Sequence, residues 1–497
     1  MTGDFPAPDT GSVPGSQIVC SVAWAALGAL LRYVLAGITT LILARLLTPR
    51  EIGLFAITLL AGELVSHIAI TGFHDAIIQR DVHLDSAYLN TAFWSALLAA
   101  GALVGLVLAL TGPVAALFDQ PDLGPLLAAM AFAGLLRAAG TVPRALLAQR
   151  MDFRTLALAR AAGMALGGCA AVLAALLGAG AWSWIVHAAV VNGAGTFLAW
   201  RVAGWRPAPQ ICRAHLRGLW AFALSVSSFA ILALVISHAD DQLIGYRLGP
   251  RALGFYAMAY GVMAWPVRDV LGGVSVVVYP VLARHQTDRA RLQATYLDST
   301  RLMTFFAFPI LIQIIVTGPT IMPWLVGDRW TPMVLTMQIL AFNGLREALT
   351  MLNGALFRAV GSPQLHAVYG ACSAACYIAA FVTGLDFGIE GVAFFFTLTG
   401  LILLPVSLWL VLRTLRMSAR RWLAALLPGA VAVCAMAGAC TALQVAARGL
   451  FGSLAAAWLA ALLGGIVYLA TLGWLAPETV GTVVREVRRL VRDWIGG

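Results

Sequence analysis

The sequence contains little charge and no lysine. Asp, Glu, Lys and Arg make up 11% of its 497 residues, whereas 61% are hydrophobic and the mean hydropathy is +0.88. Ordinary soluble domains carry about 25% charged and about 45–50% apolar residues. The composition therefore excludes an ordinary soluble protein and indicates a polytopic membrane protein. The net charge of +10 comes entirely from arginine, and we attribute it to loops that flank the membrane rather than to nucleic-acid binding.

Other absences exclude further classes. None of the seven cysteines forms a CxxC pair, so the sequence indicates no metal site and no cofactor. The apolar runs are long and unbroken instead of alternating, which excludes a transmembrane β-barrel. Residues 1–18 carry no basic side chain, unlike the start of a cleaved signal peptide. We expect them to form a disordered cytoplasmic tail before an uncleaved first helix.

About 14 spanning helices of roughly 20 apolar residues fit the chain. We place them at 19–44, 51–72, 88–110, 125–148, 155–177, 181–202, 219–237, 255–282, 302–325, 332–357, 363–384, 388–412, 422–445 and 452–475. The loops on the side that holds both termini then contain 19 arginines, and the opposite loops contain 6. Because basic residues concentrate in cytoplasmic loops, this division predicts that both termini are cytoplasmic.

A short motif divides the chain into two related halves. Residues 45–56 read RLLTPREIGLFA and residues 247–257 read RLGPRALGFYA, so that a Pro-Arg-x-x-Gly turn recurs at an offset of 201. Residues 131–138 and 341–348 form a second similar pair, at an offset of 210. Six predicted helices separate the two turns, which places both on the external face. The chain is therefore predicted to be a parallel duplication about an axis along the membrane normal.

We expect an all-α fold in which two six-helix bundles surround a central cavity. Two extra helices and an amphipathic helix on the cytoplasmic membrane surface follow the second bundle, the latter because apolar residues recur at helical spacing opposite arginines. The expected division is a tail at 1–18, bundles at 19–205 and 206–413, the added helices at 414–476 and the surface helix at 477–497.

Several ionisable residues lie inside the predicted spans, where each costs about 2.5–3.5 kcal/mol on insertion scales. Since guanidinium groups hold phosphate oxygens in a bidentate way, arginines in a cavity predict a bulky anionic ligand. The candidates for substrate binding are Arg32, Arg137, Arg268 and Arg346. The candidates for energy coupling, which could change protonation state, are Glu63, His67, Asp269 and Glu347.

A purely structural interpretation stays open for these residues. Arg268 could pair with Asp269, and Arg346 with Glu347, although adjacent helical residues point about 100° apart and face each other poorly. Arg160 lies near a helix end, where its side chain could extend to the interface. We interpret His187 and His238 as ordinary packing residues.

Four segments carry a resemblance to a known family: ARLLTPREIGLF at 44–55, QRMDFR at 149–154, GAGAWSW at 178–184 and RLGPRALGFY at 247–256. With them the chain resembles the bacterial polysaccharide exporters, Wzx-type flippases of the multidrug/oligosaccharidyl-lipid/polysaccharide superfamily. The resemblance implies a transporter, not an enzyme, that moves an undecaprenyl-pyrophosphate-linked oligosaccharide across the inner membrane by alternating access. It also implies the lipid bilayer, a polymerase and glycosyltransferases as partners.

The resemblance extends to single positions. Cavities of the family carry arginines on the first and eighth helices, which match Arg32 and Arg268. Some relatives also have an arginine on the second helix, where this sequence has Glu63 and His67. Two alternatives remain open: a cation-coupled drug exporter would favour carboxylates on the first or seventh helix, and a membrane polymerase or glycosyltransferase would need a large loop.

Overall fold

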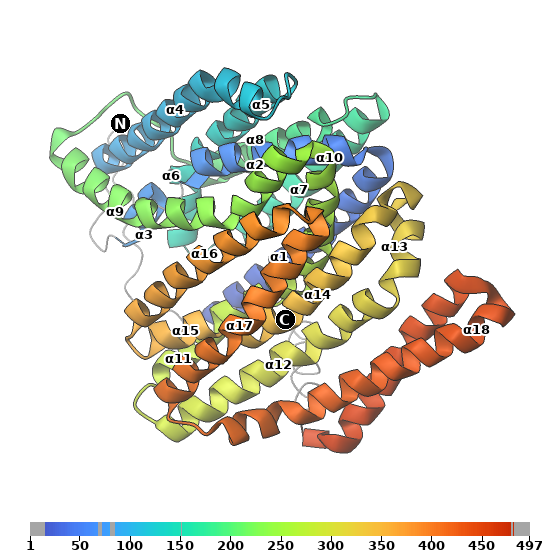
Figure 1. The fold of residues 1–497 in the computed structure, drawn as a ribbon. Coiled ribbons are helices and arrows are strands. Elements are labelled where there is room, and N and C mark those ends of the chain that lie inside the picture. Colours follow the sequence, from blue (N-terminus) through green and yellow to red (C-terminus); the bar gives the residue numbers. More distant parts are fainter. Residues whose placement is uncertain (1–14, 68–71, 80–84, 151, 479–480, 482–497) are drawn as a thin grey trace. The chain divides into compact units, whose positions relative to one another are not determined.

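The computed structural model describes residues 15–67, 72–79, 85–150, 152–478 and 481. Every regular element within them is helical, and ten helices are long and apolar enough to cross a membrane. The chain forms two compact units, Met1–Gly254 (unit 1) and Phe255–Gly497 (unit 2), whose helices are labelled in Figure 1. The expected tail up to residue 14 and most of the expected surface helix lie outside the described residues.

Unit 1 is built from long helices joined by short connections. It contains α1 (Gly15–Leu46), α2 (Pro49–His67), α3 (Asp75–Gln79), α4 (Ser86–Leu117), α5 (Leu123–Ala138), α6 (Thr141–Gln149), α7 (Phe153–Leu176), α8 (Trp182–Ala203), α9 (Arg213–Ser237) and the first part of α10 (Ala239–Ala264). The spans expected at 155–177 and 181–202 coincide with α7 and α8 to within two residues. The hydropathy of the sequence thus locates these helices correctly.

Unit 2 continues from α10. It contains the π-helix η2 (Trp265–Val270), α11 (Gly272–Arg284), α12 (Arg289–Val316), α13 (Gly318–Val326), the 3₁₀-helix η3 (Asp328–Met333), α14 (Val334–Thr350), α15 (Asn353–Ala359), α16 (Pro363–Leu385), α17 (Gly388–Leu415) and α18 (Ala419–Leu475). The two extra helices expected near the end are the two arms of α18, which turn at Gly452, where φ is 80°. Cys440 Sγ in the first arm lies 3.1 Å from the Ala460 carbonyl oxygen in the second.

Two differences from the expected map concern where a helix begins and whether it is continuous. Residues 289–301, expected as part of a loop, are the start of α12, because the side chain of Asp288 caps the helix by accepting from the Arg291 N–H at 3.1 Å. The expected helix at 125–148 is broken into α5 and α6, and the expected helix at 332–357 is likewise broken into α14 and α15. An offset of 212 relates the two breaks, since α5 ends at Ala138 and α14 at Thr350, close to the offset of 210 in the sequence pair.

Packing inside each unit supports the duplication. In unit 1, a Cβ atom built on Gly134 would lie 2.8 Å from the carbonyl oxygen of Gly62. In unit 2, a Cβ atom on Gly344 would lie 3.0 Å from Met263 Cγ. Gly344 follows Gly134 by 210 residues and Met263 follows Gly62 by 201, the same two offsets that the sequence shows. The same helix contact therefore occurs once in each half.

The recurring motif acquires a structural role in unit 1. Thr48 and Glu51 form a capping box at the start of α2, in which the Thr48 N–H donates to Glu51 Oε2 at 2.7 Å and the Glu51 N–H donates to Thr48 Oγ1 at 3.4 Å. Such reciprocal bonds satisfy donors that a helix start leaves free. Pro49 then occupies the first helical position, where its missing N–H costs nothing.

The glycines of the two motif copies pack against each other. A Cβ atom on Gly53 would overlap the Pro250 carbonyl oxygen, and a Cβ atom on Gly254 would overlap the Pro49 carbonyl oxygen. The backbones of α2 and α10 therefore cross in direct contact. The Pro-Arg-x-x-Gly pattern recurs because each copy supplies the glycine on which the proline carbonyl of the other copy rests.

Candidate functional site

Four arginines in unit 1 lie close enough for their charges to repel one another: Arg32 on α1, Arg137 on α5, Arg144 on α6 and Arg160 on α7. Arg137 and Arg160 are exposed, and Arg32 and Arg144 are half-buried. Among the described residues, none of the four has a carboxylate oxygen within ion-pair distance. Four helices thus bring together a positive cluster that we call the basic cluster.

Helix packing explains why Arg32 and Arg160 are neighbours. A Cβ atom on Gly28 would overlap the Ala157 side chain, and one on Gly168 would contact Thr39 Oγ1. Both pairs differ by 129 residues, so α1 and α7 run parallel in one register. This register sets Arg32 level with residue 161. Arg160 therefore lies beside Arg32 although 128 positions separate them in the chain.

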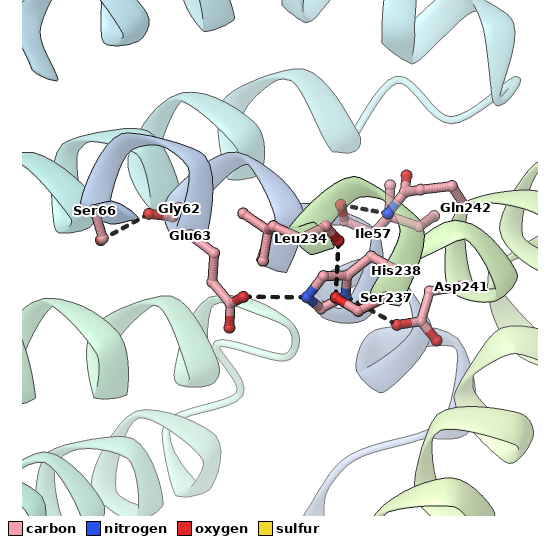
Figure 2. A network of polar contacts seen from close by, with 9 residues as sticks. All are labelled: Ile57, Gly62, Glu63, Ser66, Leu234, Ser237, His238, Asp241 and Gln242. Atoms are coloured by element: carbon pink, nitrogen blue, oxygen red, sulfur yellow. Dashed lines mark hydrogen bonds and ion pairs between the residues drawn. The ribbon is translucent and has the colours of Figure 1, made fainter. Parts of the chain in front are cut away.

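Glu63 belongs to a second polar group, which Figure 2 shows. Its carboxylate oxygen Oε2 lies 3.1 Å from His238 Nε2, and the other ring nitrogen of His238 lies 3.3 Å from Asp241 Oδ2. The charges of Arg137 and His67 also act on Glu63. The imidazole thus bridges a carboxylate of α2 and one of α10, and Gln242 adds a bond from its Nε2 to the Ile57 carbonyl oxygen at 3.4 Å.

Unit 2 holds its candidate residues differently. Arg268 binds Glu347 through Nε at 2.8 Å and Nη2 at 2.7 Å, and its guanidinium carbon lies 5.2 Å from the centre of the Tyr260 ring. Arg346 instead donates from Nε to Asn343 Oδ1 at 2.9 Å. The structure therefore pairs Arg268 with Glu347, 79 residues away. The side chain of Asp269 lies outside the described part of the chain.

The pair Arg268–Glu347 leads to a prediction about stability. Glu347→Gln should lower the thermal midpoint of the purified protein, because Arg268 then loses the charged acceptor of its hydrogen bonds, and the Glu347 side chain that provides it is only 18% exposed. The double variant Arg268→Gln, Glu347→Gln removes both charges and should recover most of the lost midpoint. A thermal-unfolding assay in detergent measures both. A double variant less stable than Glu347→Gln would contradict the pairing.

Sequence reasoning found part of this arrangement. It singled out Arg32, Arg137, Glu63 and His67, which the structure brings together in unit 1. It missed His238, interpreted as a packing residue, although two aspartates follow it closely in the sequence. It also set aside Arg160 and did not consider Arg144, since both lie near ends of apolar runs. Among the described residues, no group of three His, Cys, Asp or Glu side chains is placed to hold a metal ion.

Comparison with known proteins shows which family and which relatives the chain resembles. The family described as "Polysaccharide biosynthesis protein" matches residues 42–335. The succinoglycan biosynthesis transport protein ExoT of Rhizobium meliloti (strain 1021) is 26% identical over 324 residues, 65% of this chain and 65% of that protein. The lipopolysaccharide biosynthesis protein WzxC of Escherichia coli (strain K12) is 22% identical over 374 residues, 74% of this chain and 75% of that protein. The first of these relatives is thus matched over less than two thirds of its length.

Solved structures show the same fold at low sequence identity. The lipid II flippase MurJ in an inward closed conformation has a TM-score of 0.69 at 14% identity and covers 92% of this chain and 99% of its own. A multidrug resistance MATE transporter in an inward-facing conformation has a TM-score of 0.57 at 13% identity and covers 83% of this chain and 98% of its own. The matched family spans more than half of the chain, so the chain belongs to the polysaccharide biosynthesis protein family.

Proposed function

We propose that this protein flips an undecaprenyl-pyrophosphate-linked oligosaccharide from the cytoplasmic to the periplasmic leaflet of a bacterial inner membrane by alternating access. The observation that carries the proposal is the basic cluster, in which no arginine has a carboxylate oxygen within ion-pair distance among the described residues. Holding like charges close together is unfavourable, so the cluster fits a site that an anion completes. The polysaccharide biosynthesis that the names of ExoT and WzxC describe agrees with such a substrate.

The headgroup and the tail of the substrate need different paths across the membrane. A pyrophosphate and its sugars cannot cross hydrocarbon, whereas the polyprenyl tail never needs to leave it. Arg32 and Arg137 in unit 1, and Arg268 and Arg346 in unit 2, are proposed to contact the headgroup, because guanidinium groups suit phosphate oxygens. Glu63, His67, Asp269 and Glu347 are proposed to couple transport to an ion gradient by changing protonation state. No covalent step on the substrate is required, so we propose a transporter and not an enzyme.

The orientation follows the positive-inside rule, with both termini and residues 206–217 in the cytoplasm. In this orientation the glycosyltransferases that build the oligosaccharide act on the side where it enters, and the polymerase acts where it leaves. Reporter fusions after Gly497 should therefore be active only in the cytoplasm. Fusions active only in the periplasm would overturn the orientation.

Complementation tests the function. Expression in a strain that lacks the flippase of its own polysaccharide gene cluster should restore polymer at the cell surface if the repeat units are compatible, so strains with several different repeats are compared. Because the chain shares its fold with a MATE transporter, drug export is the competing function. A chain that restores no polymer in any strain but lowers the accumulation of cationic drugs would be an exporter. In the described part of the chain, no carboxylate lies within ion-pair distance of the basic cluster, which argues against that result.

A further inference from the structure

The side chain of Arg144 is held in place by its neighbours at the break between α5 and α6. Its guanidinium lies directly over Gly140, where a Cβ atom would overlap Nη2, and Nη2 donates to Thr196 Oγ1. Thr196 in turn donates to the Leu136 carbonyl oxygen at 2.8 Å. The missing side chain at residue 140 and the hydroxyl of Thr196 therefore fix where the charge of Arg144 lies.

The break itself is held by one face of α8. Asn192 Nδ2 donates to the Ala133 carbonyl oxygen at 3.0 Å, and Trp200 Nε1 donates to the Ala139 carbonyl oxygen at 3.0 Å. With Thr196 between them, these side chains recur every four residues on α8. Carbonyl groups that a broken helix leaves free must be bonded inside the membrane. These three side chains fix the break against α8, and Arg144 is bonded to the middle one, Thr196.

Arg160 and His74 lie near Arg144. Arg160 lies beside Arg32 through the register of α1 and α7, and the charges of Arg137 and Arg160 both act on Arg144. His74, at the start of α3, lies within range of Arg144 and Arg160, and its Nδ1 is 3.1 Å from Asp75 Oδ1. Asp75 is thus bonded to His74 and has no arginine of this group within ion-pair distance.

We propose that Arg144 and Arg160, together with Arg137, form an oxyanion-binding subsite at the α5–α6 break of unit 1. The subsite is additional to the contacts of Arg32 in the proposed function, and its physiological role rests on that function. Its ligand is a tetrahedral phosphoryl group, because a fixed guanidinium and an exposed one can bind two oxygens of one phosphate. A metal cation is excluded by the sign of the surrounding charge.

The position of the subsite suggests its order of use. In the proposed orientation, α6 ends and α7 begins on the cytoplasmic side, whereas Arg137 lies about two helical turns before Arg144 on the same predicted span. A phosphate that enters from the cytoplasm meets Arg144 and Arg160 before Arg137. The subsite is therefore the first oxyanion contact, and it should determine capture of the substrate more than its passage.

A binding measurement with sodium pyrophosphate tests the subsite. The purified chain in neutral detergent is titrated at constant ionic strength, and the thermal midpoint is followed. Arg144→Gln and Arg160→Gln should each raise the apparent Kd by about tenfold to a hundredfold, the range for one charge-assisted contact. Arg213→Gln, an exposed arginine in the first turn of α9, is the control and should leave Kd unchanged. Equal weakening in all three variants would show that pyrophosphate senses only net charge, and would overturn the proposal.

Thr196→Val tests whether the charge of Arg144 must be held in position to bind pyrophosphate or only needs to be nearby. Valine keeps the shape but removes the hydroxyl that holds Arg144, so Kd should rise by severalfold while the ligand-free thermal midpoint changes little. If Arg144→Gln fails to fold, Arg160→Gln and Thr196→Val decide the question, because the first side chain is exposed and the second change is conservative. Unchanged binding in both would overturn the subsite.

Two sources could supply the phosphoryl group, and nanodiscs distinguish them. Loss of pyrophosphate binding in phosphatidylglycerol discs, but not in phosphatidylcholine discs, would identify an anionic membrane lipid as a competing ligand of the subsite. Retained binding in both would favour the lipid-linked diphosphate. Complementation tests the subsite separately from the transport proposal. If the wild-type chain exports polymer and the Arg144→Gln and Arg160→Gln variants export it equally well, the proposed function is retained and the subsite is rejected.

Discussion

Arg137→Gln is expected to abolish polymer export while the protein still reaches the membrane. Arg137 is exposed on α5, lies within range of Arg32 and has no carboxylate within ion-pair distance among the described residues. Removal of the Arg137 charge does not leave Glu63 unpaired, because Glu63 keeps its contact with His238 at 3.1 Å. The change should therefore act on substrate binding and not on folding. Loss of one charge-assisted contact weakens binding by roughly ten- to a hundredfold.

The measurement is surface polymer in a flippase-deficient strain, with membrane abundance quantified in the same cells. Arg137→Lys keeps the charge but loses the bidentate geometry, so partial export is expected. Arg213→Gln again serves as the control and should export normally. Full polymer production by the double variant Arg32→Gln, Arg137→Gln at normal abundance would show that the basic cluster does not hold the substrate.

Hydropathy predicted the spanning helices well because burial in lipid is decided locally, residue by residue. It could not predict the start of α12, since residues 289–301 are helical but polar and lie outside the apolar run. It also could not predict the break between α5 and α6. The carbonyl groups of Leu136 and Ala139 at that break are bonded by Thr196 and Trp200, which lie about sixty residues further along the chain. A local pattern contains no trace of such partners.

The candidate site shows the same limit. The cost of burying charge drew attention to Arg32 and Arg137, because each lies in the middle of an apolar run. Arg160 lies near the end of its run, and only the parallel register of α1 and α7 brings it level with Arg32. Arg268 pairs with Glu347, 79 residues away, because adjacent residues on a helix point apart. Partners that are distant in sequence are decided by helix packing, which one sequence does not reveal.

Alanine at Gly53 or Gly254 is expected to destabilise the protein strongly. The added methyl group at either position would meet a backbone carbonyl of the opposite motif copy, at Pro250 or Pro49. A backbone atom cannot turn aside as a side chain can, so α2 and α10 must separate. Overpacking a close contact costs about 1–3 kcal/mol, occasionally more. The thermal midpoint in detergent should fall for each variant, and membrane abundance should fall with it.

The matched control is Gly261→Ala, on the same helix α10, where a Cβ atom would meet nothing within 4 Å. Alanine there should be neutral or slightly stabilising, since it favours helix more than glycine does. The reciprocal contact also predicts the double variant. Once one methyl group has separated the helices, the second finds space, so Gly53→Ala with Gly254→Ala should lose less stability than the sum of the single losses. Full additivity would mean that the two glycines act at independent contacts and that the motif copies do not share one crossing.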